Sequence, residues 1–156
     1  MTNRNVAYLL LALGLVLVPG MVAEGQELMF RSLTVNDGLS VSHVSAIAQD
    51  SHGFLWFGTA GGGLNRFDGY EFEVFRHRED DPTTISSNSV LALHVDSNGT
   101  LWVGTNQGLD KYDHATESFT RFRHLTQDDT TIGAGAVGSI ATDSLGRVWL
   151  ASNDNL

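Results

Sequence analysis

A motif that recurs every 46 or 47 residues constrains this chain more than any other feature. The three tryptophans, Trp56, Trp102 and Trp149, are spaced by 46 and 47 residues, and each follows an Asp-Ser-x-Gly turn. The three copies of the motif extend over 44–69, 90–114 and 137–156. Self-similarity at a fixed period of this length is typical of repeat folds, in which each unit buries its apolar face against the next.

Apolar and polar residues alternate within one copy, which indicates β-strands. The second copy predicts four short strands joined by tight turns, at 90–95, 100–105, 109–112 and 118–122. Four antiparallel strands in a unit of this length make one blade of a β-propeller. The sequence therefore predicts an all-β fold, a β-propeller of four-stranded antiparallel blades. About two and a half blades are present, in an incomplete ring.

The domain organisation follows from the repeats. We expect a first blade over 41–78, a second over 86–125 and a truncated third over 133–156. Residues 28–40 are expected to form an orphan outer strand and the lead-in to the first blade, because such a strand covers the open edge of the last blade in closed propellers. Since two and a half blades cannot close a ring, we expect the chain to be the N-terminal part of a longer protein.

Aspartate, glycine and tryptophan recur at fixed positions of each copy. A catalytic acid is needed once, whereas a turn acid is needed in every blade, so this recurrence predicts a structural role. The aspartate carboxylate is expected to accept backbone N–H bonds across the turn, and glycine to supply a positive φ. We expect the tryptophan to pack between neighbouring blades. The structural repeat positions are Asp50, Gly53, Trp56, Gly58, Thr59, Asp96, Gly99, Trp102, Gly104, Thr105, Asp143, Gly146 and Trp149.

Residues 1–25 have the layout of a secretory signal peptide. Arg4 gives a positive start, 6–18 are apolar or small, and Pro19 and Gly20 end the apolar run. An uncleaved membrane anchor is the alternative, although this run is shorter than the roughly 20 residues that span a bilayer. The chain also has no cysteine, and its 18 acidic against 9 basic residues argue against a nucleic-acid partner. We expect export to the periplasm.

The repeated motif resembles the two-component regulator propeller repeat. Its pattern is Asp-x-x-Gly-x-(Leu/Val)-Trp-(Phe/Val/Leu)-(Gly/Ala)-(Thr/Ser), followed by Gly-Leu-(Asn/Asp)-(Arg/Lys)-(Phe/Tyr)-Asp. The first two copies match both parts, at 50–59 with 63–68 and at 96–105 with 108–113. The third copy departs from the pattern, because Ala151-Ser152 replaces Gly-Thr and Asn155 stands where glycine is expected.

This resemblance implies the ligand-sensing periplasmic region of a bacterial transmembrane signal-transduction protein. The output domain implied is that of a hybrid sensor histidine kinase or a diguanylate cyclase, and it is absent from this chain. The partners implied are a small-molecule or oligosaccharide ligand and a second copy in a homodimer of the full-length protein. The membrane would be reached only through parts not in this chain. The alternative is a secreted β-propeller that binds carbohydrate or protein without signalling output.

No catalytic residue, cofactor or metal site is predicted for this chain, and we do not expect it to be an enzyme on its own. Its six histidines show no spacing typical of metal ligands, so structural or exposed roles are expected for them. Ligands of propellers usually contact the loops of one face around the central channel. By position alone, the ligand-binding candidates are Asn106, Gln107, Ser87 and Asn88.

Overall fold

The computed structural model describes residues 29–125 and 131–153. All strands belong to one unit, which extends over 32–156. The expected signal peptide over 1–25 lies outside the described residues, as do 126–130 and 154–156. Within the described part, no helix is long and apolar enough to cross a lipid bilayer.

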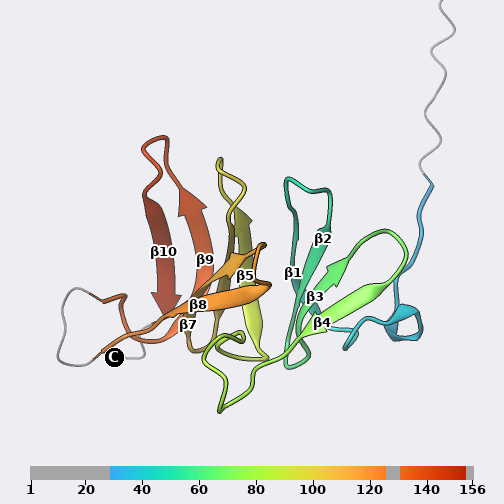
Figure 1. Ribbon diagram of the computed structural model, residues 1–156, viewed down its shortest axis with the longest axis horizontal. Helices are drawn as coiled ribbons and strands as arrows, with labels where there is room; N and C mark the ends of the chain where they lie inside the picture. Colours follow the sequence, from blue (N-terminus) through green and yellow to red (C-terminus); the bar gives the residue numbers. More distant parts are fainter. Residues whose placement is uncertain (1–28, 126–130, 154–156) are drawn as a thin grey trace, which may run out of the picture. The chain divides into compact units, whose positions relative to one another are not determined.

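The described residues form three antiparallel sheets (Figure 1). The first has the strand order β1-β2-β3-β4, the second has the order β5-β6-β7-β8, and the third pairs β9 with β10. The predicted all-β fold with four-stranded antiparallel blades in an incomplete ring is confirmed. The strands are β1 Val44–Gln49, β2 Leu55–Thr59, β3 Gly63–Phe67, β4 Phe72–Phe75, β5 Val90–Val95, β6 Leu101–Thr105, β7 Gly108–Asp113, β8 Ser118–Phe122, β9 Ala136–Thr142 and β10 Val148–Asn153.

One aspartate builds the turn between the first two strands of each blade. The Asp50 carboxylate accepts bonds from the backbone N–H groups two and four residues further on, at 2.9 and 3.0 Å. It also accepts a bond from the Trp56 indole at 2.7 Å. The same three bonds recur at Asp96 and at Asp143. The glycine three residues after each aspartate has a φ between 76° and 91°, the left-handed region that glycine adopts without strain.

The main hydrophobic core lies between the first and second blades. Trp56 on β2 is completely buried, and its ring centroid lies 4.8 Å from that of Tyr112 on β7 and 5.6 Å from that of Phe75 on β4. Because β7 and β8 belong to the next blade, the indole packs between blades. Trp102 is half-buried and Trp149 is 57% exposed. Trp56 packs against the third strand of the next blade, and the described residues contain no such strand after β10. The other buried members are Leu64, Ile85, Val90, Leu101, Val103 and Phe119.

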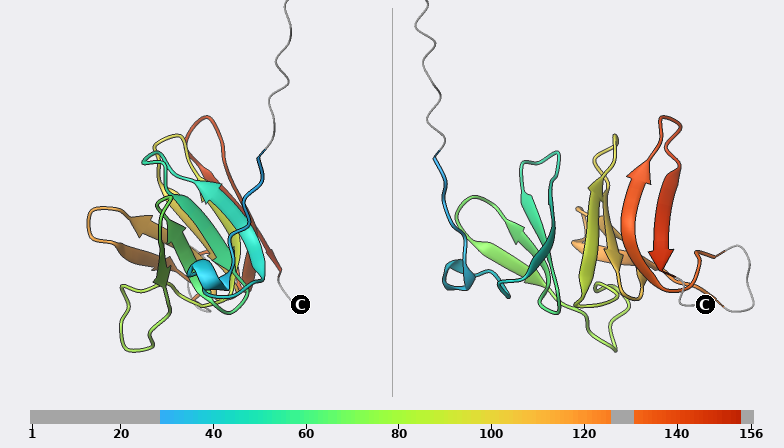
Figure 2. Two further views of the ribbon diagram at one scale, coloured as in Figure 1. Left: turned by 90° about the vertical axis from the view of Figure 1, so that its right-hand side faces the viewer. Right: turned by 180° about the vertical axis from the view of Figure 1, so that it is seen from behind.

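Glycine on the second strand of each complete blade allows the next blade to approach closely. A Cβ atom on Gly58 would lie 2.6 Å from Cγ1 of Val90, and one on Gly104 would lie 2.4 Å from the carbonyl oxygen of Val137. Real side chains do not fit at such distances, so glycine is required by packing at both positions. The first strands of the blades, β1, β5 and β9, lie side by side, as Figure 1 and the right-hand view of Figure 2 show.

The segment before β1 differs from the expected outer strand over 28–40. Residues 29–34 form no strand, and a short 3₁₀ helix, η1 (Val35–Asp37), follows them. Thr34 caps this helix, since its hydroxyl accepts the Asn36 N–H at 3.2 Å. A strand requires a partner strand, and the blade that this segment was expected to complete is not among the described residues. The outer strand therefore stays a prediction.

Candidate functional site

The two ends of each blade carry different connections. Because successive strands alternate in direction, the β1–β2 and β3–β4 turns lie at one end, which we call the turn end. The β2–β3 turn and the connections between blades lie at the other end, which we call the connection end (Figure 1). The ligand-binding candidates from the sequence all belong to the connection end.

Ser87 and Asn88, in the connection between the first two blades, are used inside the chain. Ser87 is buried, and its hydroxyl accepts the Ser89 N–H at 3.0 Å. Asn88 Oδ1 accepts the backbone N–H of His77 at 2.8 Å, and the Asn88 carbonyl accepts two N–H groups of the β2–β3 turn. These contacts fix the connection against the first blade.

Asn106 and Gln107 form the β6–β7 turn, and both are exposed. The Asn106 N–H donates to the Ser89 carbonyl at 3.2 Å, which holds this turn against the connection that carries Ser87 and Asn88. The structure therefore brings the four candidates to the same end of the blades. Asn106 and Gln107 are the two of the four that are exposed, so they remain the better candidates for contacting a ligand.

A buried polar residue occupies the same position in each of the first two blades. On β3, Asn65 Oδ1 accepts the Ser40 N–H at 2.9 Å, and Asn65 Nδ2 donates to the Phe57 carbonyl at 3.3 Å. On β7, Asp110 Oδ2 accepts the Ser86 N–H at 2.8 Å, whereas Asp110 Oδ1 is buried without a hydrogen-bond partner. Burial raises the pKa of Asp110 to about 6, because the carboxylate loses its hydration.

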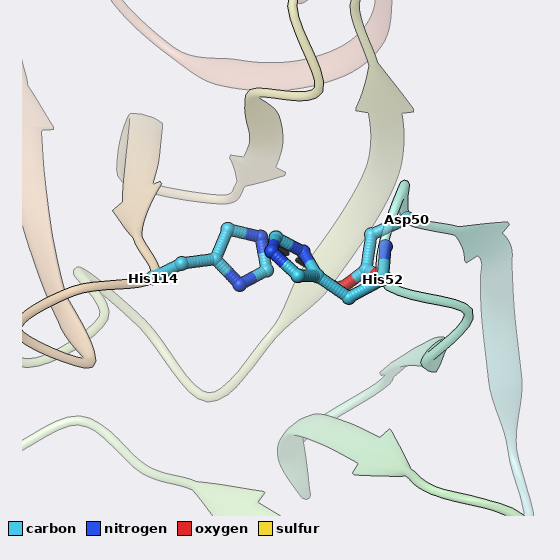
Figure 3. A group of neighbouring side chains, drawn as sticks. All are labelled: Asp50, His52 and His114. Atoms are coloured by element: carbon cyan, nitrogen blue, oxygen red, sulfur yellow. Dashed lines mark hydrogen bonds and ion pairs between the residues drawn. The ribbon is translucent and has the colours of Figure 1, made fainter.

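Asp50, His52 and His114 lie together at the turn end, and their side chains point toward one another (Figure 3). Asp50 and His52 belong to the β1–β2 turn, and His114 belongs to the β7–β8 turn of the next blade. His114 Nε2 lies 3.7 Å from Asp50 Oδ2, and the centroids of the two imidazole rings are 4.4 Å apart. One potential ligand atom from each residue lies within 4.8 Å of the other two.

This group is partly buried, and one of its nitrogens has no partner. The Asp50 side chain is completely buried, the His114 side chain is 24% exposed, and His114 Nε2 is buried without a hydrogen bond. Burial lowers the pKa of His114, which favours the neutral imidazole. Imidazole nitrogens and a carboxylate oxygen are ligands that Zn²⁺ accepts. The sequence predicted no metal site because the two histidines, 62 residues apart, come from turns of different blades.

The first two repeats are similar to those of known proteins. The sequence model of a family described as two component regulator propeller matches residues 38–61 and 84–107, which are the lead-in and first two strands of each complete blade. Histidine kinase P4 of Formosa agariphila is 41% identical to this chain over 83 residues. That match covers 53% of this chain and 6% of the kinase.

Solved structures share the blade arrangement. The extracellular domain of BT3049 from B. thetaiotaomicron, described as a hybrid two-component system, superposes with a TM-score of 0.69 at 28% identity. That match covers 77% of this chain and 17% of the BT3049 chain. Two structures of the BT4673 extracellular domain from the same organism, at 24% and 23% identity with TM-scores of 0.54 and 0.58, share the fold. This chain therefore spans less than a fifth of the length of each of these relatives.

Proposed function

We propose that this chain, whose residues 38–61 and 84–107 match the two component regulator propeller, forms the ligand-sensing propeller portion of a periplasmic sensor region in a bacterial signal-transduction protein. The observation that supports this most is the likeness to the BT3049 extracellular domain, which combines 28% identity with a TM-score of 0.69. The identity with Histidine kinase P4 favours a sensor histidine kinase as the output of the whole protein. A diguanylate cyclase is the second output that we propose to test.

We propose that the ligand is a small molecule or oligosaccharide and that it binds at the connection end. The exposed amides of Asn106 and Gln107 each offer donors and an acceptor, which suit the hydroxyl groups of a sugar. Ligand binding shifts a conformational equilibrium only when the ligand binds one arrangement better than the other. We propose that ligand binding changes the spacing between blades and that a homodimer of the full-length protein transmits this change.

The first test is to read the gene downstream of Leu156. A transmembrane segment followed by a histidine kinase or cyclase domain supports the proposal. A reading frame that ends after seven or eight repeats, without either part, contradicts it and favours a secreted carbohydrate- or protein-binding propeller.

The second test measures signalling in inner-membrane vesicles that contain the full-length protein. Histidine phosphorylation from ATP is followed while a panel of oligosaccharides is added, and an active glycan is then tested on Gln107→Ala. We expect this variant to need a higher glycan concentration. Gln49→Ala, the same change at an exposed residue on the turn end of β1, is the matched control and should respond as the wild type does. If both variants need the same glycan concentration, the proposal that the glycan binds at the connection end is contradicted.

A further inference from the structure

We propose that Asp50, His52 and His114 form a binding site for a divalent transition-metal ion of the Zn²⁺ class, which clips the first blade to the second. The site is independent of the signalling proposal, because it rests on three side chains and their surroundings. It joins the β1–β2 turn of one blade to the β7–β8 turn of the next (Figure 3). No linear motif contains both histidines, so the site exists only in the folded chain.

The distances are close to those of a metal site. Bonds of about 2.0–2.2 Å to a tetrahedral Zn²⁺ ion place neighbouring ligand atoms roughly 3.3 Å apart. Asp50 Oδ2 and His114 Nε2 are already 3.7 Å apart. One potential ligand atom from each of the three residues lies within 4.8 Å of the other two. His52 is exposed, so its imidazole can rotate to close the remaining gap.

The carboxylate is held in place before any metal arrives. Asp50 Oδ1 accepts two backbone N–H bonds of its own turn, at 2.9 and 3.0 Å. Asp50 Oδ2 accepts the Trp56 indole N–H at 2.7 Å, and a carboxylate oxygen retains a second lone pair beside one such bond. Hydrogen bonds of this kind orient metal ligands and strengthen metal binding. His114 Nε2, buried without a hydrogen bond, would gain its missing partner.

The repeated turns form without a histidine at either position. The residue at the position of His52 is Asn98 in the second blade and Leu145 in the third, and both of these turns form the same aspartate bonds. His114 follows Asp113 as Gly69 follows Asp68 in the first blade. Turn formation therefore explains the aspartate in every blade but neither of the two histidines that meet at this boundary.

The ligand set selects the metal. Two imidazole nitrogens with one carboxylate suit Zn²⁺ and its neighbours, whereas Ca²⁺ and Mg²⁺ prefer oxygen ligands throughout. A polar pocket of about 400 Å³ adjoins the histidines, with Ser51, Asn98, Lys111 and Asp113 among its lining residues. A water molecule from this pocket would complete the coordination. Arg66, a nearby cation, is paired with Glu73 and Glu117, which offsets its charge.

The test is Zn²⁺ binding to the full-length protein produced without a histidine tag, measured by calorimetry and by the thermal midpoint. We expect one Zn²⁺ per chain and a midpoint that rises with Zn²⁺ concentration. His52→Asn should lower the affinity by tenfold or more, and it copies Asn98, so the turn should still fold. His114→Gln should have a similar effect. His43→Asn, the same change at an exposed histidine outside the group, should leave the affinity unchanged.

Co²⁺ provides a spectroscopic check that does not depend on affinity. Four-coordinate Co²⁺ absorbs visible light much more strongly than six-coordinate Co²⁺, and we expect the strong bands in the wild type and their loss in His52→Asn. The proposal is overturned if wild type and His52→Asn bind Zn²⁺ equally, or if His43→Asn weakens binding as much. A weak six-coordinate Co²⁺ spectrum that His52→Asn does not alter also overturns it. If His114→Gln fails to fold, the comparison of wild type with His52→Asn is sufficient to test the proposal, because His52 is exposed.

Discussion

Asp110→Asn tests the buried polar position that the first two blades share. In the first blade, Asn65 accepts a backbone N–H with one side-chain atom and donates to the Phe57 carbonyl with the other. Asp110 makes the first bond, but an ionised carboxylate has no hydrogen to donate toward Val103, its partner on β6. The substitution supplies this donor. We therefore expect Asp110→Asn to stabilise the protein at neutral pH.

The expected gain follows from the pKa of Asp110. Burial raises this pKa from 3.8 to about 6, and each unit is worth 1.36 kcal/mol, so the ionised form costs about 3 kcal/mol of folding free energy. A carboxyl whose pKa is raised on folding contributes stability that is present below pH 3.8 and is lost as the pH rises through about 6. The asparagine variant does not undergo this loss. At about 2–4 °C per kcal/mol, its thermal midpoint should be roughly 6–12 °C higher above pH 7.

The assay is equilibrium unfolding in urea at about pH 4 and about pH 7.5. The difference between Asp110→Asn and wild type should grow from under about 1 kcal/mol to about 3 kcal/mol between these two conditions. Other carboxylates titrate in both proteins and cancel in the difference. Asp80→Asn, at an exposed position, is the matched control and should show no such growth. The reciprocal change Asn65→Asp should introduce a pH-dependent loss. A difference that is independent of pH, or a variant that is less stable at both pH values, would refute the reasoning.

Two further predictions concern packing between blades. Gly58→Ala puts a Cβ atom 2.6 Å from Val90 and should cost about 1–3 kcal/mol, whereas Gly138→Ala, where nothing lies within 4 Å, should change little in the same urea assay. Trp56→Ala should cost about 3–5 kcal/mol, because the indole is completely buried between blades. Trp149→Ala should cost less than about 2 kcal/mol at a side chain that is 57% exposed, and equal losses for the two tryptophans would contradict a core between blades.

The blade fold could be predicted because each blade repeats its chemistry locally. Asp50 finds its turn partners within six residues, and Gly53 serves the same turn, so the periodic pattern was sufficient. The bond from the Trp56 indole to Asp50 was not predicted, although both positions were identified as structural. A recurring position shows that a residue is needed but does not show which atoms meet.

The candidate sites depend on contacts between blades, and these were harder to predict. His52 and His114 come together only after two turns of different blades pack. The sequence did contain one signal for this group, because His52 departs from the repeat: the equivalent residues in the other two copies are Asn98 and Leu145. Ser87 was named as a ligand-binding candidate from its position between two blades, but its burial and its bond to the connecting backbone are properties of the folded chain.

The boundary between the first two blades links the two proposed sites physically. Asn106 at the connection end is bonded to the segment that joins these blades, and His114 at the turn end touches Asp50 across the same boundary. If both ligands respond to the spacing of these blades, any factor by which Zn²⁺ changes the glycan affinity must equal the factor by which the glycan changes the Zn²⁺ affinity. Gly58→Ala alters this spacing without touching either site, because its added Cβ meets Val90. It should therefore change the Zn²⁺ affinity, because the proposed metal site spans this boundary. It should change the glycan affinity as well if the boundary is the coupling element, and leave the glycan affinity unchanged if the sites act separately.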